Sequence, residues 1–142
     1  MYLFVYGTLM NGERAHFMLA KAMFLGSVHV RNCKLYNMGS FPGLKASKDP
    51  FNQVKGELYR ISPDMLPHLD GYEGYRDGDE GSLYIRDSVT CFQEGKVTEA
   101  ETYFINRQVD EDTVIKTGDW RTRGKLYARE VGTKEGTRPE AG

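Results

Sequence analysis

The first nine residues constrain the fold more than any other part of the chain. An apolar run over residues 1–5 is followed at once by Tyr6, Gly7, Thr8 and Leu9. A short apolar run that stops at a glycine predicts a buried strand, and the backbone N–H groups after the glycine can turn toward an anion or a polarised carbonyl. The sequence therefore predicts a strand that leads into an anion-binding loop.

A second cluster, near the middle of the chain, offers a carboxylate that could serve such a loop. Glu73 stands between Tyr72 and Gly74, with Tyr75 following. Burial beside aromatic rings would raise the pKa of this carboxyl group toward neutrality, as a proton shuttle requires. The alternatives are that Glu73 is a solvated acid after a helix and that residues 6–8 form an ordinary turn.

The composition argues against several classes of partner. The chain has 142 residues, the usual size of one domain. Its 19 basic and 20 acidic residues nearly cancel, and no block of five Lys or Arg occurs, so neither nucleic acid nor a membrane surface is an expected partner. No apolar run approaches about 18 residues, and the first run is too short for a signal peptide. We expect a soluble, cytoplasmic protein.

The cysteine content indicates neither redox chemistry nor a metal site. Cys33 and Cys91 lie far apart and show no CxxC or Cys/His ligand spacing. We expect both to be buried or half-buried free thiols, because isolated cysteines in strand-like runs behave as small hydrophobes. A catalytic cysteine would need a neighbouring histidine, and we expect His16 to be structural.

The periodicity predicts short helices and antiparallel strands. Helical spacing predicts a helix over residues 11–22 with Asn11 as its N-cap, and Ser62, Pro63 and Asp64 begin a second helix that ends just before Glu73. Strands are predicted over residues 26–38, 54–61, 83–92 and 98–105, with turns at 31–32, 48–52 and 94–96 and a surface loop at 76–82.

These elements predict the α+β class, as a small, twisted, mainly antiparallel β-barrel with short helices and a pocket at one mouth. Periodicity alone does not distinguish a barrel from a sandwich. The domain is predicted to cover residues 1–127. The polar residues 128–142 lack apolar periodicity and are predicted to form a flexible tail.

Six motifs occur in one order along residues 4–120, and together they carry a resemblance that none carries singly. The set resembles the γ-glutamylcyclotransferase-like family, in its bacterial and AIG2-like branch. The motifs are VYGTLM at residues 5–10, followed by Gly12, Glu13 and His16; FPGL at 41–44, which matches a loop of the family; VKGELY at 54–59, which matches a strand; LDGYEGY at 69–75; SLYIR at 82–86; and GDW at 118–120.

The resemblance implies a reaction. Members of this family release 5-oxoproline from a γ-glutamyl amide: the α-amine of the substrate attacks its own γ-carbonyl and expels the attached amine. Glu73 would act as general base and then as general acid. Tyr6, Gly7, Thr8 and Leu9 would form the substrate loop, with backbone N–H groups stabilising the oxyanion. No metal or cofactor is implied.

The resemblance also implies supporting roles for other residues. Tyr84 and Arg86 would position the carboxylate or the loop around Glu73, although a strand arginine can also serve only to tie surface loops together. We expect Asp70 to bind backbone near the helix end. Trp120 is expected in the core or in the pocket wall.

Other functions remain open at this point. The main alternative is a non-catalytic small-molecule binding module on the same fold, and a scaffold in a larger assembly is a third possibility. Retention of Glu73 favours the enzyme, because an acidic side chain adds little to a pocket that only binds an acidic ligand. The expected substrate is a γ-glutamyl amine or peptide; neither its amine leaving group nor the oligomeric state can be read from the sequence.

Overall fold

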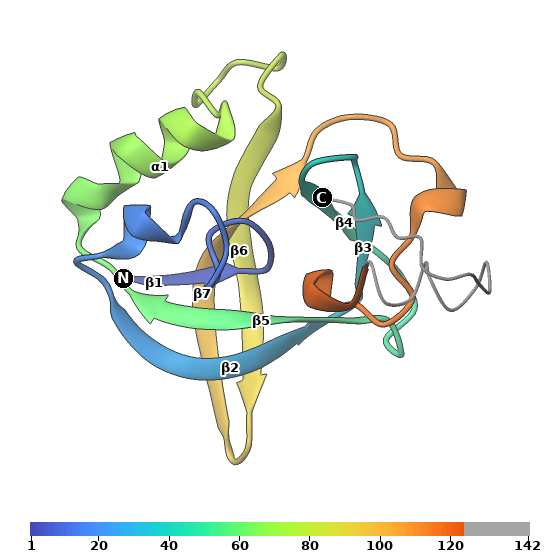
Figure 1. The fold of residues 1–142 in the computed structure, drawn as a ribbon, viewed down its shortest axis with the longest axis horizontal. Helices are drawn as coiled ribbons and strands as arrows, with labels where there is room; N and C mark the ends of the chain where they lie inside the picture. The colour runs from blue at the N-terminus through green and yellow to red at the C-terminus, as the bar shows by residue number, and fades with distance from the viewer. Residues whose placement is uncertain (124–142) are drawn as a thin grey trace.

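Five strands close into a barrel in the computed structural model, which describes residues 1–123 (Figure 1). Their order around the barrel is β1-β5-β2-β6-β7. Neighbouring strands are antiparallel except β7 and β1, which meet in parallel at Leu3 and Glu101. The barrel and the α+β class are confirmed. The strands are β1 Tyr2–Val5, β2 Met23–Arg31, β5 Gln53–Arg60, β6 Tyr84–Gln93 and β7 Lys96–Ile105.

The limits predicted for the domain and its tail cannot be compared with the structure. The tail predicted at residues 128–142, and residues 124–127 at the end of the predicted domain, lie outside the described residues.

A second, two-stranded sheet packs against the barrel. It pairs β3 (Cys33–Asn37) with β4 (Pro42–Ala46), and β4 contacts β7. The turn expected at residues 31–32 separates β2 from β3, with Asn32 at a φ of 59°. The FPGL motif, expected as a loop, instead runs into β4, because its glycine and leucine are buried in an antiparallel pair rather than exposed.

The helix expected over residues 11–22 is wrong. The structure has turns followed by one short 3-10 helix, His16–Leu19. The backbone here makes bonds that an α-helix would not allow. Ala15 donates its N–H to the Thr8 carbonyl at 2.9 Å, whereas an α-helix would pair it with the Asn11 carbonyl, which instead accepts from Arg121. Gly12, at a φ of +87°, lies outside helical geometry. Long-range contacts therefore override helix-compatible composition.

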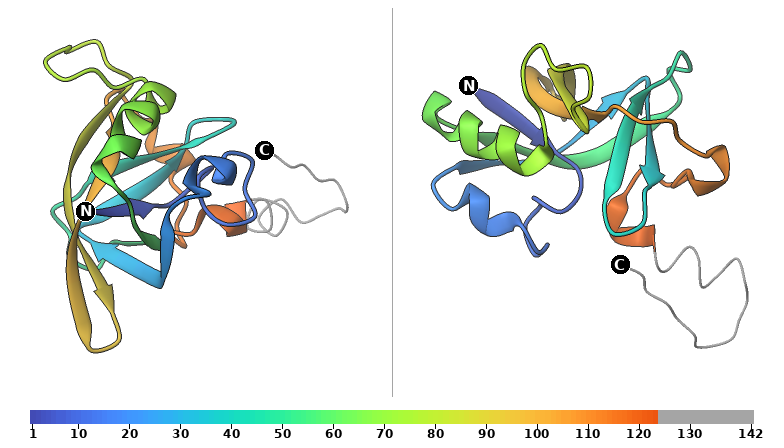
Figure 2. Two further views of the ribbon diagram at one scale, coloured as in Figure 1. Left: turned by 90° about the vertical axis from the view of Figure 1, so that its left-hand side faces the viewer. Right: turned by 90° about the horizontal axis from the view of Figure 1, so that it is seen from above.

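The helix that carries the candidate carboxylate is α1 (Leu66–Glu73), which lies beside β1 and the upper part of β6 (Figures 1 and 2). A 3-10 helix, Pro63–Met65, precedes it. Ser62 precedes that 3-10 helix as expected, but its hydroxyl bonds the Asp64 carboxylate rather than a backbone N–H. Two further 3-10 helices, Glu111–Thr113 and Trp120–Thr122, follow β7.

The core fills the barrel and the space between the barrel and the small sheet. Phe4 and Trp120 are both 1% exposed, which places Trp120 in the core. Cys33 and Cys91 are buried free thiols, as expected. Burial raises the pKa of Cys33 to about 11 and that of Cys91 to about 12, so both remain protonated at neutral pH.

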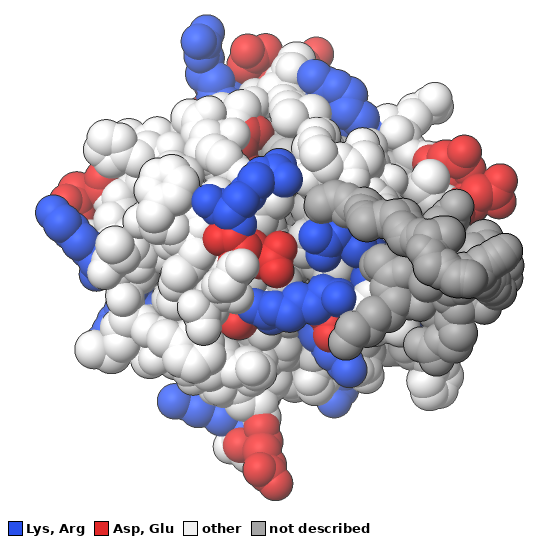
Figure 3. Space-filling model, viewed as in Figure 1, with Lys and Arg blue, Asp and Glu red and all other residues white. Residues whose placement is uncertain are grey.

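The surface carries charges of both signs. Figure 3 shows lysine and arginine interspersed with aspartate and glutamate on one face of the molecule. Over residues 1–123, no helix has the length and apolar character needed to cross a membrane.

Candidate active site

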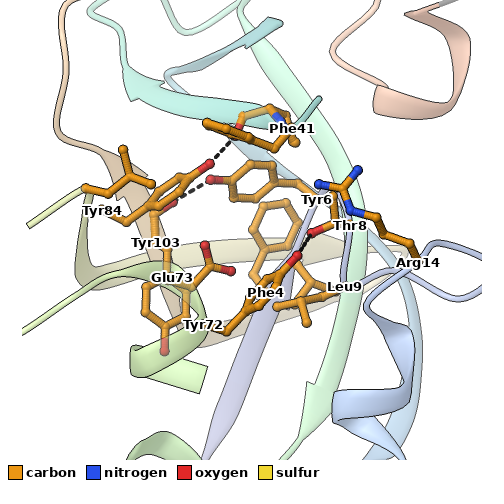
Figure 4. Close-up of a pocket in the computed structure, with 14 residues that line it drawn as sticks. Phe4, Tyr6, Thr8, Leu9, Arg14, Phe41, Tyr72, Glu73, Tyr84 and Tyr103 are labelled. Carbon is orange, nitrogen blue, oxygen red and sulfur yellow. Dashed lines mark hydrogen bonds between the residues drawn. The ribbon is translucent and has the colours of Figure 1, made fainter. Parts of the chain in front are cut away.

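A cavity of about 250 Å³ lies at one end of the barrel (Figure 4). Strands β1 and β7 run parallel, so their carboxyl ends lie at the same end of the barrel as the start of the antiparallel β6. Residues from these three strand ends line the cavity, together with the loop after β1, the start of β4 and the end of α1. The fold thus assembles the cavity from segments far apart in sequence.

The loop after β1 is held in place by its glycine and its tyrosine. A Cβ atom added to Gly7 would lie 2.3 Å from Cγ of Pro42, so only glycine lets the loop approach β4 this closely. The Tyr6 hydroxyl donates a buried hydrogen bond of 2.6 Å to the carbonyl of Tyr103 on β7. The loop is therefore fixed between two neighbouring strands.

The carbonyl groups of this loop are used internally, whereas its N–H groups are not. Met10 donates its N–H to the Gly7 carbonyl at 3.0 Å, and Ala15 donates to the Thr8 carbonyl at 2.9 Å. Within the described part of the chain, the N–H groups of Gly7, Thr8 and Leu9 have no protein acceptor. Donors left free beside a cavity can bind an anion or an oxyanion.

A buried carboxylate anchors the far end of the loop. Glu57, 6% exposed, accepts the Asn11 N–H at 2.8 Å and pairs with Arg121 at 3.2 Å. His16 Nδ1 lies 3.0 Å from the Leu9 carbonyl, which accords with the structural role expected for it. These contacts hold the loop backbone from outside the cavity.

Glu73 is the last residue of α1, rather than just beyond the helix as expected. Gly74 ends the helix in the left-handed region at a φ of 67°, and the Tyr75 N–H bonds back to the Asp70 carbonyl at 2.9 Å. Figure 4 shows the Glu73 carboxyl group directed into the cavity. It has no hydrogen bond or ion pair among residues 1–123, and desolvation raises its pKa to about 8.

Neutral hydroxyl groups surround this carboxyl group. Burial raises the pKa values of Tyr6, Tyr84 and Tyr103 well above the usual value, so all three stay protonated. The hydroxyls of Thr8 and Tyr72 lie 2.7 Å apart and join the loop to α1 (Figure 4). The site therefore keeps Glu73 among neutral groups, with no charged partner in the described part of the chain.

Arg86 lies outside the residues that line the cavity. Its guanidinium contacts Asp70 at 3.0 Å and Glu101 at 3.3 Å. The Asp70 carboxylate also accepts the Tyr103 hydroxyl at 2.6 Å. The expectation that this carboxylate binds backbone is wrong, because its oxygens accept hydrogen bonds from the side chains of Arg86 on β6 and Tyr103 on β7. Arg86 thus acts on the cavity only through α1 and Tyr103.

The structure brings together most of the residues expected in the site. Tyr6, Gly7, Thr8, Leu9, Glu73 and Tyr84 all line the cavity. Sequence reasoning missed Tyr103 and Arg14, which line it too. Tyr103 lies in the site because it pairs with Arg86 across β6 and β7. No local sequence motif predicts this pairing. Among the described residues, no three His, Cys, Asp or Glu side chains form a group that could hold a metal ion.

The comparisons with known proteins agree with this architecture. A model of the family described as "Gamma-glutamyl cyclotransferase, AIG2-like" matches residues 3–122. The chain therefore belongs to this family. YtfP of Escherichia coli strain K12, a "Gamma-glutamylcyclotransferase family protein", is 30% identical over 125 residues, which cover 88% of this chain and all of the relative.

Two further relatives extend the comparison. "Gamma-L-glutamyl-butirosin B gamma-glutamyl cyclotransferase" of Niallia circulans is 31% identical over 136 residues, covering 94% of this chain and 83% of the relative. The crystal structure of YkqA from Bacillus subtilis superposes with a TM-score of 0.70 at 24% identity, covering 91% of this chain and 42% of that one. This last similarity shows the fold alone.

Proposed function

We propose that this protein is a γ-glutamyl amide cyclotransferase that releases 5-oxoproline and a free amine. The observation that carries the proposal is the unpaired Glu73 carboxyl group, with a pKa of about 8, in the same cavity as the loop whose N–H groups lack acceptors. The Niallia circulans relative is named as a cyclotransferase for a γ-glutamyl compound, which supports the same class of substrate.

Few protein groups are needed for this reaction, because the nucleophile is tethered to its electrophile. Glu73 accepts a proton from the α-ammonium, and the freed amine attacks the γ-carbonyl. A carbon–nitrogen bond forms while the carbonyl electron pair moves onto oxygen. The N–H groups of Gly7, Thr8 and Leu9 stabilise that oxyanion.

Collapse of the intermediate re-forms the carbonyl and breaks the bond to the leaving nitrogen. The ring nitrogen gives up two protons in all, and Glu73 passes both in turn to the leaving nitrogen, which departs as an ammonium ion. Protons and charge balance, and the carboxylate returns to its starting state. A group with a pKa near the working pH suits both transfers, and such shuttles contribute about 100- to 10,000-fold.

The remaining residues act on this machinery indirectly. The hydrogen bond between Thr8 and Tyr72 sets the distance between loop and helix. Tyr84 lines the cavity and donates its hydroxyl to the Pro42 carbonyl, which supports a role for it as a wall of the substrate site. Arg86, held by Asp70, positions the helix that carries Glu73.

The test is release of 5-oxoproline from a panel of γ-glutamyl amines, γ-glutamyl amino acids and γ-glutamyl peptides, measured by chromatography. We expect release from at least one class. Binding of γ-glutamyl ligands without any release across the panel would instead support the non-catalytic binding module.

The pH dependence follows from the raised pKa of Glu73. The free enzyme must hold this group as a carboxylate to accept the substrate's proton, so kcat/KM should rise about tenfold per pH unit below pH 8 and level off above it. A carboxyl group at its usual value of 4.5 would give a flat profile from pH 6 upward. Initial rates at low substrate concentration between pH 5.5 and about 9 distinguish the two profiles.

A further inference from the structure

An arginine without an ion-pair partner stands at the rim of the candidate active site. Arg14 is the one basic side chain among the described residues that line the cavity, and it is exposed. Its guanidinium donates a 2.8 Å hydrogen bond to the Ser40 carbonyl. No carboxylate within residues 1–123 lies within ion-pair distance of it.

Two other arginines near this end of the barrel form ion pairs within the fold. Arg86 pairs with Asp70, and Arg121 pairs with Glu57. The charge of Arg14, in contrast, serves no internal partner. Its bond to Ser40 spans from the loop after β1 to the turn before β4 and fixes the guanidinium across the rim. One terminal nitrogen is used in this way, which leaves further donors of the guanidinium fork for a ligand.

The position of Arg14 indicates which part of a substrate it meets. Figure 4 shows Glu73 on one side of the cavity and Arg14 on the other, beyond Thr8. The reacting carbon must lie between Glu73 and the loop N–H groups, whereas the leaving amine must be able to depart. The cavity volume of about 250 Å³ is below the roughly 300–1,000 Å³ usual for drug-sized ligands, so a leaving group of any length extends to the rim.

Resting on the proposed function, we propose that Arg14 binds a carboxylate carried by the leaving amine. The preferred substrates are then γ-glutamyl amides of amino acids or short peptides, rather than of uncharged alkylamines. A planar guanidinium with a fixed orientation recognises a carboxylate through paired hydrogen bonds. Because the rim is exposed, solvent weakens the ion pair, and we expect a preference of about 3- to 5-fold.

The test compares two substrates that differ only at the proposed contact: γ-glutamylalanine and its C-terminal amide. The wild-type protein should show a kcat/KM for the acid about 3- to 5-fold above that for the amide. Arg14→Gln should reduce this ratio to about 1–2, with the loss falling mainly on the acid. Arg14→Lys keeps the positive charge but loses the paired donors of the guanidinium. Its ratio of kcat/KM for the acid to that for the amide should lie between those of the wild type and Arg14→Gln.

Lys96→Gln is the matched control, because it removes one exposed positive charge at the turn between β6 and β7, at the end of the hairpin opposite α1 (Figure 1). It should keep the wild-type ratio. Thermal unfolding of each variant verifies the fold, and the charge-retaining Arg14→Lys gives a readout even if Arg14→Gln is poorly folded.

The possible results separate the inference from the function on which it rests. Equal losses for acid and amide in Arg14→Gln would overturn the inference, since Arg14 would then contact the γ-glutamyl part that both substrates share. Absence of a wild-type preference, or release from other γ-glutamyl amines but from neither of this pair, would overturn it too and leave the proposed reaction standing. No 5-oxoproline from any γ-glutamyl amide would refute the proposed function itself.

Discussion

Replacing Glu73 by glutamine is expected to lower kcat about 100- to 10,000-fold while making the protein more stable at alkaline pH. Glutamine has nearly the same shape and fills the same space at the end of α1, but it cannot accept or return a proton. The loop N–H groups remain in place, so substrate binding should change far less than turnover. The measurement is kcat and KM for the best substrate of the panel, with 5-oxoproline as the product followed.

The gain in stability follows from the direction of the pKa shift. Desolvation raises the pKa of Glu73 from its usual 4.5 to about 8, so the folded state binds this proton more tightly than the unfolded state does. The wild-type protein is then most stable below pH 4.5 with respect to this group, and it loses stability as pH rises from 4.5 through 8. A glutamine stays neutral throughout and does not incur this loss.

The stability difference is therefore itself pH-dependent. Glu73→Gln should match the wild type near pH 4 and exceed it by on the order of 2–4 kcal/mol in free energy of unfolding at pH 9. Urea unfolding at both pH values measures this difference. Glu94→Gln, an exposed acid in the turn between β6 and β7, is the control and should change neither stability nor kcat. Full turnover in Glu73→Gln would remove this residue from the mechanism.

The parts of the fold that the sequence predicts are those with local causes. The sequence predicts β5, β6 and β7 because their β-branched and aromatic runs are bounded by turn residues. Gly95 is one of these turn residues and has a φ of 69° between β6 and β7. Glu73 and the loop after β1 could be proposed because their motifs are contiguous. The resemblance to the family is what places Glu73 and this loop in the same site.

The parts that the sequence does not predict depend on contacts between distant residues. Residues 11–22 have a helix-compatible composition, yet the Asn11 carbonyl, which an α-helix would pair with the Ala15 N–H, accepts instead from Arg121, 110 positions away. Tyr103 enters the site through the pairing of β6 with β7, and its carbonyl accepts the hydroxyl of Tyr6, 97 positions away. A single sequence carries no local signal of such pairings, because their energy exists only after the barrel has closed.

The backbone of the loop after β1 matters as much as the carboxylate that it faces, and Gly7→Ala is expected to lower kcat at least 100-fold. The new Cβ would lie 2.3 Å from Cγ and 2.8 Å from Cδ of Pro42. A proline ring cannot rotate out of the way, so the loop itself must move and carry its N–H groups away from the oxyanion. Losing one such donor alone costs about 100- to 1,000-fold in kcat.

A matched glycine in α1 shows whether the added methyl group or its contact with Pro42 is responsible. Gly71→Ala makes the same chemical change where nothing lies within 4 Å, and a glycine inside a helix gains about 0.5–1 kcal/mol of stability from it. Its kcat should stay within about twofold of wild type because the helix end does not move. Loss of turnover in Gly71→Ala would mean that α1 tolerates no change near Glu73.

The double variant Gly7→Ala/Pro42→Ala tests the cause directly, because Pro42→Ala removes the two ring atoms that the new methyl group would strike. The Tyr84 hydroxyl bonds the backbone carbonyl of residue 42, and that carbonyl is still present in the double variant. If crowding displaces the loop, Gly7→Ala should do more harm alone than in the Pro42→Ala background, with a coupling of about 1–3 kcal/mol in a double-mutant cycle on kcat/KM. Strict additivity would mean that the added methyl group acts on turnover by a route other than its contact with Pro42.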